Sequence, residues 1–184
     1  SLGIGTRLKW PDDYFSLYTE LSYQQYNLKN WYDYYFGFKN GLSNNLSLGI
    51  TLQRNSIDNP IYTRKGSVFS LSLNITPPYS LLSGKDYSNM PAEETRRWVE
   101  YHKWKFSAKM FTPISSNEKL VLMTRVEYGF VGYFNKYKRT PFEKFYVGGD
   151  GMSAYSSPGT EIVGLRGYNS GALTPINPTT RTSN

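Results

Sequence analysis

The segment KLVLMTRVEYGFVG, residues 119–132, decides the fold class because its side chains alternate between two chemical characters. From Leu120 to Phe130, every second residue is apolar or aromatic, with a single threonine among them. The other face carries Lys119, Val121, Met123, Arg125, Glu127 and Gly129. Successive side chains of a β-strand point to opposite faces, so this pattern predicts a strand with one apolar and one polar face.

Five further segments repeat this alternation, the first of them more weakly than the others. They cover residues 2–9, 15–24, 44–53, 67–76 and 103–110. Helical periodicity is nearly absent, and only AEETRR, residues 92–97, is compatible with a helical turn. The chain is therefore predicted to be all-β.

The connections between these segments differ systematically in length. Two short turns and one of medium length cover residues 10–14, 112–119 and 57–67. Three long loops cover residues 28–40, 78–97 and 134–184. Short connections at one end and long ones at the other indicate an antiparallel up-and-down meander, which is how outer-membrane barrels are organised.

Strand length and aromatic placement favour a transmembrane β-barrel. A tilted strand crosses a bilayer with roughly 9–11 residues, which is about the length of most of these segments. Aromatic residues gather near the segment ends, as they do in membrane-interface girdles; examples are Trp10, Tyr14, Phe111 and Tyr133. A soluble antiparallel sheet or sandwich would also alternate, so that alternative stays open. Single-chain barrels begin at about 8 strands, so we expect the remaining strands elsewhere in the gene product.

The composition argues against metal and enzyme chemistry. The 184 residues contain no cysteine and one histidine, His102, which excludes thiolate and histidine-rich metal sites. No acid–base or nucleophile constellation is present in the pattern, and no cofactor is expected. The net charge is +7, and the basic run NKYKR, residues 135–139, could suggest nucleic acid. Most such runs are solvated, and in an external loop this one would meet lipopolysaccharide phosphates.

The last long loop carries two motifs. FYVGG contributes Phe145, Tyr146, Gly148 and Gly149, and LRGY contributes Leu165, Arg166, Gly167 and Tyr168. Together they resemble the BamA/TamA superfamily of outer-membrane protein assembly factors, in which an aromatic FYxGG segment precedes a (V/I)RG(F/Y) motif in the sixth external loop. Leu165 departs mildly from that pattern. The turn in residues 59–67 is also similar to a family turn, with Thr63, Gly66 and Ser67 matching and Pro60 shifted.

The resemblance covers the whole chain and implies its architecture. It implies an all-β antiparallel meander that supplies about six of the roughly sixteen strands of a transmembrane β-barrel. Residues 1–133 would form the strand segment, and residues 134–184 would form the long external loop. The insert at residues 78–97 and the tyrosine-rich loop at residues 30–38 are similar to a Bacteroidetes-type version of the family.

The resemblance further implies that this loop folds back into the barrel lumen. Its arginine would pair there with acidic and aromatic side chains on the inner wall, where a guanidinium can make bidentate contacts that lysine cannot. The family's partner residues lie on later strands. Within this chain, the local candidates for pairing with Arg166 are Glu127 and Glu20, with Arg125 beside Glu127 on the same face.

The function implied by the resemblance is structural. The chain would form part of an insertase barrel in the outer membrane of a Gram-negative bacterium. Its partners would be nascent outer-membrane proteins, assembly-machine lipoproteins, outer-membrane lipid and lipopolysaccharide, without nucleic acid, metal or cofactor. The alternatives are a two-partner-secretion or TamA-type translocation barrel of the same superfamily, and a soluble β-sandwich that binds carbohydrate.

Overall fold

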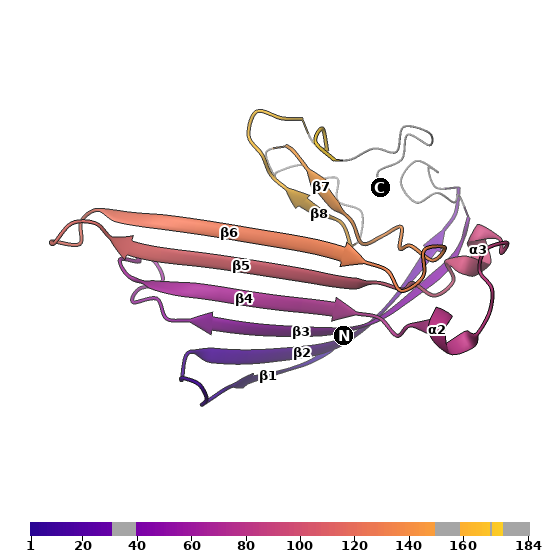
Figure 1. Cartoon of the computed structure of the whole chain (residues 1–184), viewed down its shortest axis with the longest axis horizontal. Helices are drawn as coiled ribbons and strands as arrows, with labels where there is room; N and C mark the ends of the chain where they lie inside the picture. Colours follow the sequence, from indigo (N-terminus) through magenta and orange to yellow (C-terminus); the bar gives the residue numbers. More distant parts are fainter. Residues whose placement is uncertain (31–39, 150–158, 170, 175–184) are drawn as a thin grey trace. The chain divides into compact units, whose positions relative to one another are not determined.

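The main sheet confirms the predicted all-β antiparallel meander. The computed structural model describes residues 1–30, 40–149, 159–169 and 171–174. Six strands lie side by side in sequence order, each paired with its neighbours (Figure 1). They are β1 (Leu2–Arg7), β2 (Phe15–Leu28), β3 (Gly41–Asn55), β4 (Gly66–Ile75), β5 (His102–Pro113) and β6 (Val121–Gly132). Within the described ranges the sheet stays open, with β1 and β6 at its two edges.

The strand register gathers apolar residues on one face and polar residues on the other. Ile50 lies opposite Leu73, which in turn lies opposite Trp104. On the other face, the Thr51 hydroxyl lies 3.0 Å from the Ser72 hydroxyl. Because opposite residues share a face, the alternation seen in each strand adds up to two chemically distinct surfaces of the sheet.

The structure extends β3 three residues before the predicted start at residue 44, to Gly41. This end of β3 also carries a backbone bridge outside the sheet: the Asn44 N–H donates to the Arg97 carbonyl at 2.8 Å, and the Val99 N–H donates to the Asn44 carbonyl at 2.9 Å.

Two short helices lie in the long loop between β4 and β5. The helix α3 (Ala92–Thr95) falls within the predicted helical turn. The helix α2 (Tyr79–Ser83) was not predicted; it follows Pro78 and ends at Gly84, whose φ of 61° is left-handed. Within the described residues, no helix has the length and apolar character needed to cross a bilayer.

The last loop contains two strands that the sequence did not reveal. Within the predicted long loop at residues 134–184, β7 (Phe145–Val147) and β8 (Glu161–Val163) pair in parallel (Figure 1). Three residues are too few for an alternation to be recognised. The tyrosine-rich loop at residues 30–38, on which the Bacteroidetes-type prediction partly rests, lies outside the described residues from residue 31 onward.

The chain divides into two compact units. The strand unit comprises Ser1–Tyr23, Leu46–Thr76 and His102–Phe130, and the loop unit comprises Gln24–Asn45, Pro77–Tyr101 and Val131–Asn184. The predicted division at residues 133 and 134 concerns position relative to a membrane. Contact grouping does not test that division, so it stays a prediction.

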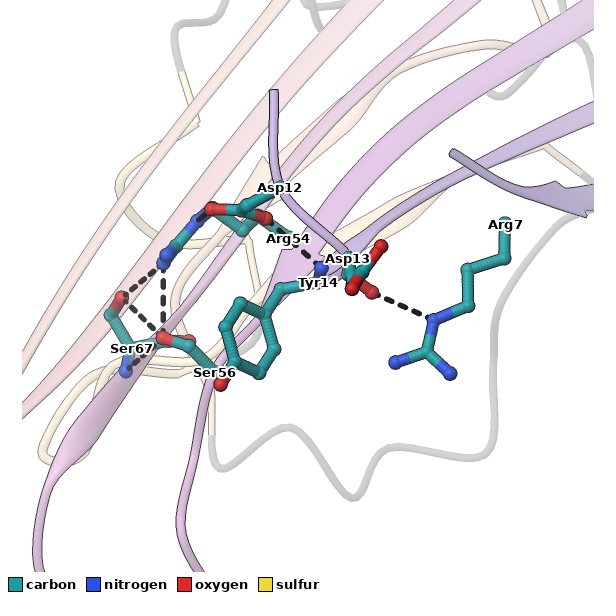
Figure 2. Close-up of polar contacts among 7 residues, drawn as sticks. All are labelled: Arg7, Asp12, Asp13, Tyr14, Arg54, Ser56 and Ser67. Carbon is teal, nitrogen blue, oxygen red and sulfur yellow. Dashed lines mark hydrogen bonds and ion pairs between the residues drawn. The ribbon is translucent and has the colours of Figure 1, made fainter. Parts of the chain in front are cut away.

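Polar contacts in the strand unit tie the first short turn to the ends of β3 and β4 (Figure 2). The Nε of Arg54 donates to Asp12 Oδ2 at 2.9 Å, and its Nη1 donates to Ser56 Oγ at 3.0 Å and to Ser67 Oγ at 3.4 Å. Asp12 also accepts the Tyr14 N–H at 2.9 Å. Arg54 continues the apolar alternation of β3, and these contacts stabilise its charge at the end of that face.

Candidate functional site

The structure brings the FYVGG and LRGY motifs together through their backbones. Tyr146 pairs with Ile162, and Val147 pairs with Val163. Beyond these strands, the Leu165 N–H donates to the Gly149 carbonyl at 2.8 Å, and the Gly149 N–H donates to the Tyr168 carbonyl at 3.0 Å. The two motifs therefore form one hydrogen-bonded element, here called the joined motifs (residues 145–149 and 161–168).

The glycines of FYVGG are required by this geometry. Gly148 has a φ of 116° and Gly149 a φ of 93°, values that side chains with a Cβ rarely adopt. A Cβ on Gly148 would stand 2.5 Å from the Asn169 carbonyl oxygen. Gly167 also has a positive φ, 89°, but a Cβ there would meet open space. Gly148 is therefore needed for close backbone approach, and Gly167 only for its turn.

A third segment closes the joined motifs from the C-terminal side. The Leu173 N–H donates to the Val147 carbonyl at 3.1 Å. The Val147 N–H donates to the Thr174 Oγ1 at 2.9 Å, and Thr174 is buried. Both backbone groups of Val147 are thus paired with this segment, which fixes the position of β7.

The joined motifs present Arg166 at their surface. Its side chain is exposed, and it forms no hydrogen bond or ion pair with any described residue. Tyr168 and Leu165 beside it are 53% and 41% exposed. A fixed backbone with a free guanidinium is a geometry suited to docking onto an acidic surface. Docking of Arg166 in a lumen remains a prediction.

Of the predicted wall residues, two pair with each other. Arg125 Nε donates to Glu127 Oε1 at 2.8 Å, and Ser107 Oγ donates to the same oxygen at 3.3 Å. These contacts place Arg125, Glu127 and Ser107 on the polar face of β5 and β6. Glu20 is half-buried, and its side chain has no hydrogen-bond or ion-pair partner in the described part of the chain.

The sequence did not identify the buried core of the loop unit. The Phe142 ring, 1% exposed, stacks on Tyr26 with centroids 4.2 Å apart and planes 19° apart. Val99 and Tyr101 complete the core. Tyr26 follows Gln24 in the polar alternation of β2, so Phe142 covers the polar face at this end of the strand. The aromatic character of position 26 on a polar face was a signal in the sequence, although Tyr18 on the same face shares it.

A buried ion pair in the loop unit was also missed. Lys138 Nζ lies 2.6 Å from Glu100 Oε1, and their side chains are 4% and 0% exposed. Glu100 also accepts the Ser80 N–H and the Ser80 hydroxyl, both at 2.6 Å. The expectation that residues 135–139 form a solvated basic run is therefore wrong for Lys138. Its partner lies 38 residues away along the chain.

Burial and charge shift the pKa values of Tyr79 and Lys144 in the loops of this unit. Burial, with the nearby Glu100 charge, raises the pKa of Tyr79 above its usual 10.0. Burial, with the charge of Arg96, lowers the pKa of Lys144. Both shifts follow from charged forms that lose water on folding. No group of three or more acidic or histidine side chains among the described residues is arranged to hold a metal ion.

An open antiparallel meander with one exposed apolar face and a motif-bearing loop defines a membrane β-barrel segment. The model of the family described as "Omp85 superfamily domain" matches residues 1–182. The chain therefore belongs to the Omp85 superfamily. This superfamily comprises outer-membrane barrels that insert or translocate proteins, and its members generally act without catalysis. A search of curated proteins found no match. Membership favours the barrel over a soluble β-sandwich.

Proposed function

We propose that this chain forms part of the barrel of a BamA-like insertase, which folds and inserts β-barrel proteins into the outer membrane of a Gram-negative bacterium. The joined motifs within an Omp85 superfamily domain are the observation that carries the proposal. They unite the two sequence signatures of the assembly-factor loop in one backbone element.

The loop's opening residues support its return toward the lumen. Phe142 packs on Tyr26, whose side chain belongs to the polar alternation of β2. Neighbouring residues of the same segment, Thr140 and Glu143, are buried as well. In a barrel of this kind the polar face of each strand lines the interior. A loop that begins on that face is directed inward.

The wall candidates differ in their capacity to receive Arg166. The Glu127 carboxylate already accepts from Arg125, whereas the Glu20 carboxylate has no partner in the described part of the chain. An unpaired carboxylate gains more from a new guanidinium than a paired one, because no existing contact has to be broken. Glu20 is therefore the favoured local partner, beside any acidic residue on strands outside this chain.

The proposed surroundings follow the two faces of the sheet and its loops. Outer-membrane lipid would cover the apolar face, and nascent barrel proteins would meet the assembled barrel. Lipopolysaccharide and assembly-machine lipoproteins would contact the parts outside the lipid. The proposed function uses neither a cofactor nor nucleic acid.

Substitution of the motif arginine in the full-length protein tests this function. In cells depleted of the wild-type protein, Arg166→Ala should lower the levels of folded outer-membrane proteins, and Arg166→Lys should restore them only in part because lysine lacks the bidentate fork. Arg64→Ala, at an exposed turn residue of the strand unit, is the matched control. Normal levels with Arg166→Ala, at equal expression, would contradict the proposal.

Reconstitution separates insertion from the translocation alternative. Proteoliposomes that contain the full-length protein should speed the insertion of an unfolded outer-membrane barrel protein added from outside. A TamA-type or two-partner-secretion role would instead appear as passage of a secreted substrate into the vesicle interior without barrel insertion. That result would overturn the insertase proposal.

A further inference from the structure

The loop unit contains an open pocket that neither the motifs nor the superfamily accounts for. Its volume is about 640 Å³. Aromatic rings and charged side chains share its lining, among them Tyr79, Tyr87, Trp98, Lys85, Glu94 and Arg97. All six belong to the insert between β4 and β5, the longest connection between strands of the main sheet.

One side of the pocket is formed by Lys138 of the buried ion pair. Lys138 lines the pocket, and its ammonium lies 5.5 Å from the ring centroid of Tyr79 and 5.2 Å from that of Tyr87. Glu100 holds this ammonium from behind and fixes the first turn of α2 through Ser80. Cation–π contacts and charge-assisted hydrogen bonds thus order two of the lining rings before any ligand binds.

The size of the pocket indicates a small group as its occupant. Small-molecule sites measure roughly 300–1,000 Å³, a range that includes this pocket. Stable protein partners bury roughly 1,200–2,000 Å² over a broad and mostly flat surface, which a concave pocket of this size does not provide. The occupant is therefore a ligand, or one unit of a longer polymer.

The charges of the lining indicate an anionic occupant. Lys138 is neutralised by Glu100, which leaves the exposed Lys85 and Arg97 against the exposed Glu94. None of these three side chains is paired with a described residue. Among the described lining residues, two cations and one carboxylate without partners suit a ligand that carries one anionic group and hydroxyl donors.

The aromatic side chains of the pocket indicate that the ligand also has a flat, partly apolar face. Trp98 is 37% exposed, and its ring lies 5.2 Å from that of Tyr79 at an angle of 46°. Such rings present their faces to flat ligands and contribute large contact area. A sugar ring has apolar C–H faces and polar hydroxyl edges, and a phosphate or carboxylate on it would supply the anionic group.

We propose that this pocket binds a saccharide unit that carries a phosphate or carboxylate. Two sources share this chemistry: the headgroup of a membrane glycolipid and a soluble acidic polysaccharide. The proposal relies on the proposed function only for the expectation that this loop lies outside the lipid. The binding itself does not require assembly activity.

Calorimetric titration of the full-length protein in detergent micelles tests the proposal with glucose 1-phosphate as the probe. Glucose alone and inorganic phosphate alone should each bind at least roughly tenfold more weakly than glucose 1-phosphate, since each lacks half of the recognised groups. Vesicles that contain a phosphorylated glycolipid and soluble galacturonic acid oligomers then distinguish the two sources by which of them competes with the probe.

Two variants locate the site. The double variant Lys85→Gln with Arg97→Gln should lower the affinity for glucose 1-phosphate roughly tenfold. Its fold should stay intact, because both side chains are exposed. Arg64→Gln with Lys65→Gln removes the same charge from an exposed turn and should leave binding unchanged. Trp98→Leu should weaken binding of glucose 1-phosphate. Trp10→Leu, at a residue that is 83% exposed, should leave that binding unchanged.

Several results would overturn the proposal. These are no measurable binding of glucose 1-phosphate, equal effects of the paired and control variants, or equally tight binding of an oligo-glutamate peptide. The last result would show a general polyanion surface. The insertion assay and the binding assay are separate. A full-length protein that binds glucose 1-phosphate but does not insert barrel proteins would contradict only the insertase proposal.

Discussion

The strand unit and the loop unit bury their side chains in opposite ways. In the strand unit large apolar residues face outward, with Ile4 78% exposed and Val126 55% exposed. In the loop unit, Phe142 is 1% exposed and the charged Glu100 is fully buried. The strand unit thus depends on a surrounding apolar medium for its stability, whereas the loop unit has a core of its own.

The largest expected effect comes from breaking the buried ion pair. Glu100→Gln would leave the Lys138 ammonium buried without its counter-charge, which costs about 3–5 kcal/mol. Hydrogen exchange of the full-length protein should show faster exchange at residues 79–83, while the main sheet stays protected.

A matched variant separates charge from packing in that result. Glu127→Gln breaks a half-exposed pair and should change stability by no more than about 1 kcal/mol. Combining Glu100→Gln with Lys138→Met removes the buried charge and should restore most of the protection. Equal exchange in Glu100→Gln and Glu127→Gln would mean that the two units do not differ as described.

Truncation of the stacked phenylalanine is expected to have the next largest effect. Phe142→Ala removes the ring that packs on Tyr26 and Tyr101 and should destabilise the loop unit by about 3 kcal/mol. Leu122→Ala is the control, because Leu122 is 53% exposed on the apolar face. Protease cleavage within residues 134–144 should rise for Phe142→Ala alone, and similar cleavage of both variants would contradict the core assignment.

A backbone test follows in the joined motifs. Gly148→Ala forces a Cβ into the Asn169 carbonyl at a positive φ and should cost about 2 kcal/mol. Gly167→Ala has open space around the new Cβ and should cost about 1 kcal/mol. Exchange at the Leu165 amide reports the difference, and the reverse order of the two variants would disprove the close approach at Gly148.

The smallest expected effect concerns a buried hydroxyl. The Tyr79 hydroxyl has no hydrogen-bond partner among the described residues, so Tyr79→Phe should change stability at neutral pH by less than about 0.5 kcal/mol. Because folding raises the pKa of Tyr79, its stabilising contribution is complete below pH 10.0 and is lost as pH rises through the folded pKa. Thermal unfolding should show this alkaline loss in the wild type and a weaker loss in Tyr79→Phe.

The same comparison explains how much of the structure was predictable. Alternation alone placed the six strands of the main sheet to within a few residues. Neighbouring residues such as Leu71 and Ser72 lie on opposite faces, and the chemical character of each residue matches its face. The pairing of Glu100 with Lys138 could not be read in this way. Glu100 stands between Val99 and Tyr101, Lys138 belongs to the basic run at residues 135–139, and only the folded loops bring the two together.

The candidate site was predictable in part for a related reason. Local motifs singled out Gly148, Gly149 and Arg166, and the glycines do occupy conformations that favour glycine. The parallel pairing of Tyr146 with Ile162 depends on the path of the chain between the two motifs, which short strands leave unspecified. The pairing of Arg166 with Glu20 or Glu127 also depends on the path of the chain, and it remains a prediction.

Accessibility of single cysteines along β6 most directly tests the claim that the strand unit is the wall of a membrane barrel. The 184 residues contain no cysteine, so each spin label reports one introduced position. In the full-length protein in lipid bilayers, labels at residues 122, 126 and 128 should be accessible to oxygen, and labels at residues 123, 125 and 127 to a water-soluble relaxation agent. Equal access of the water-soluble agent to both sets would contradict the account.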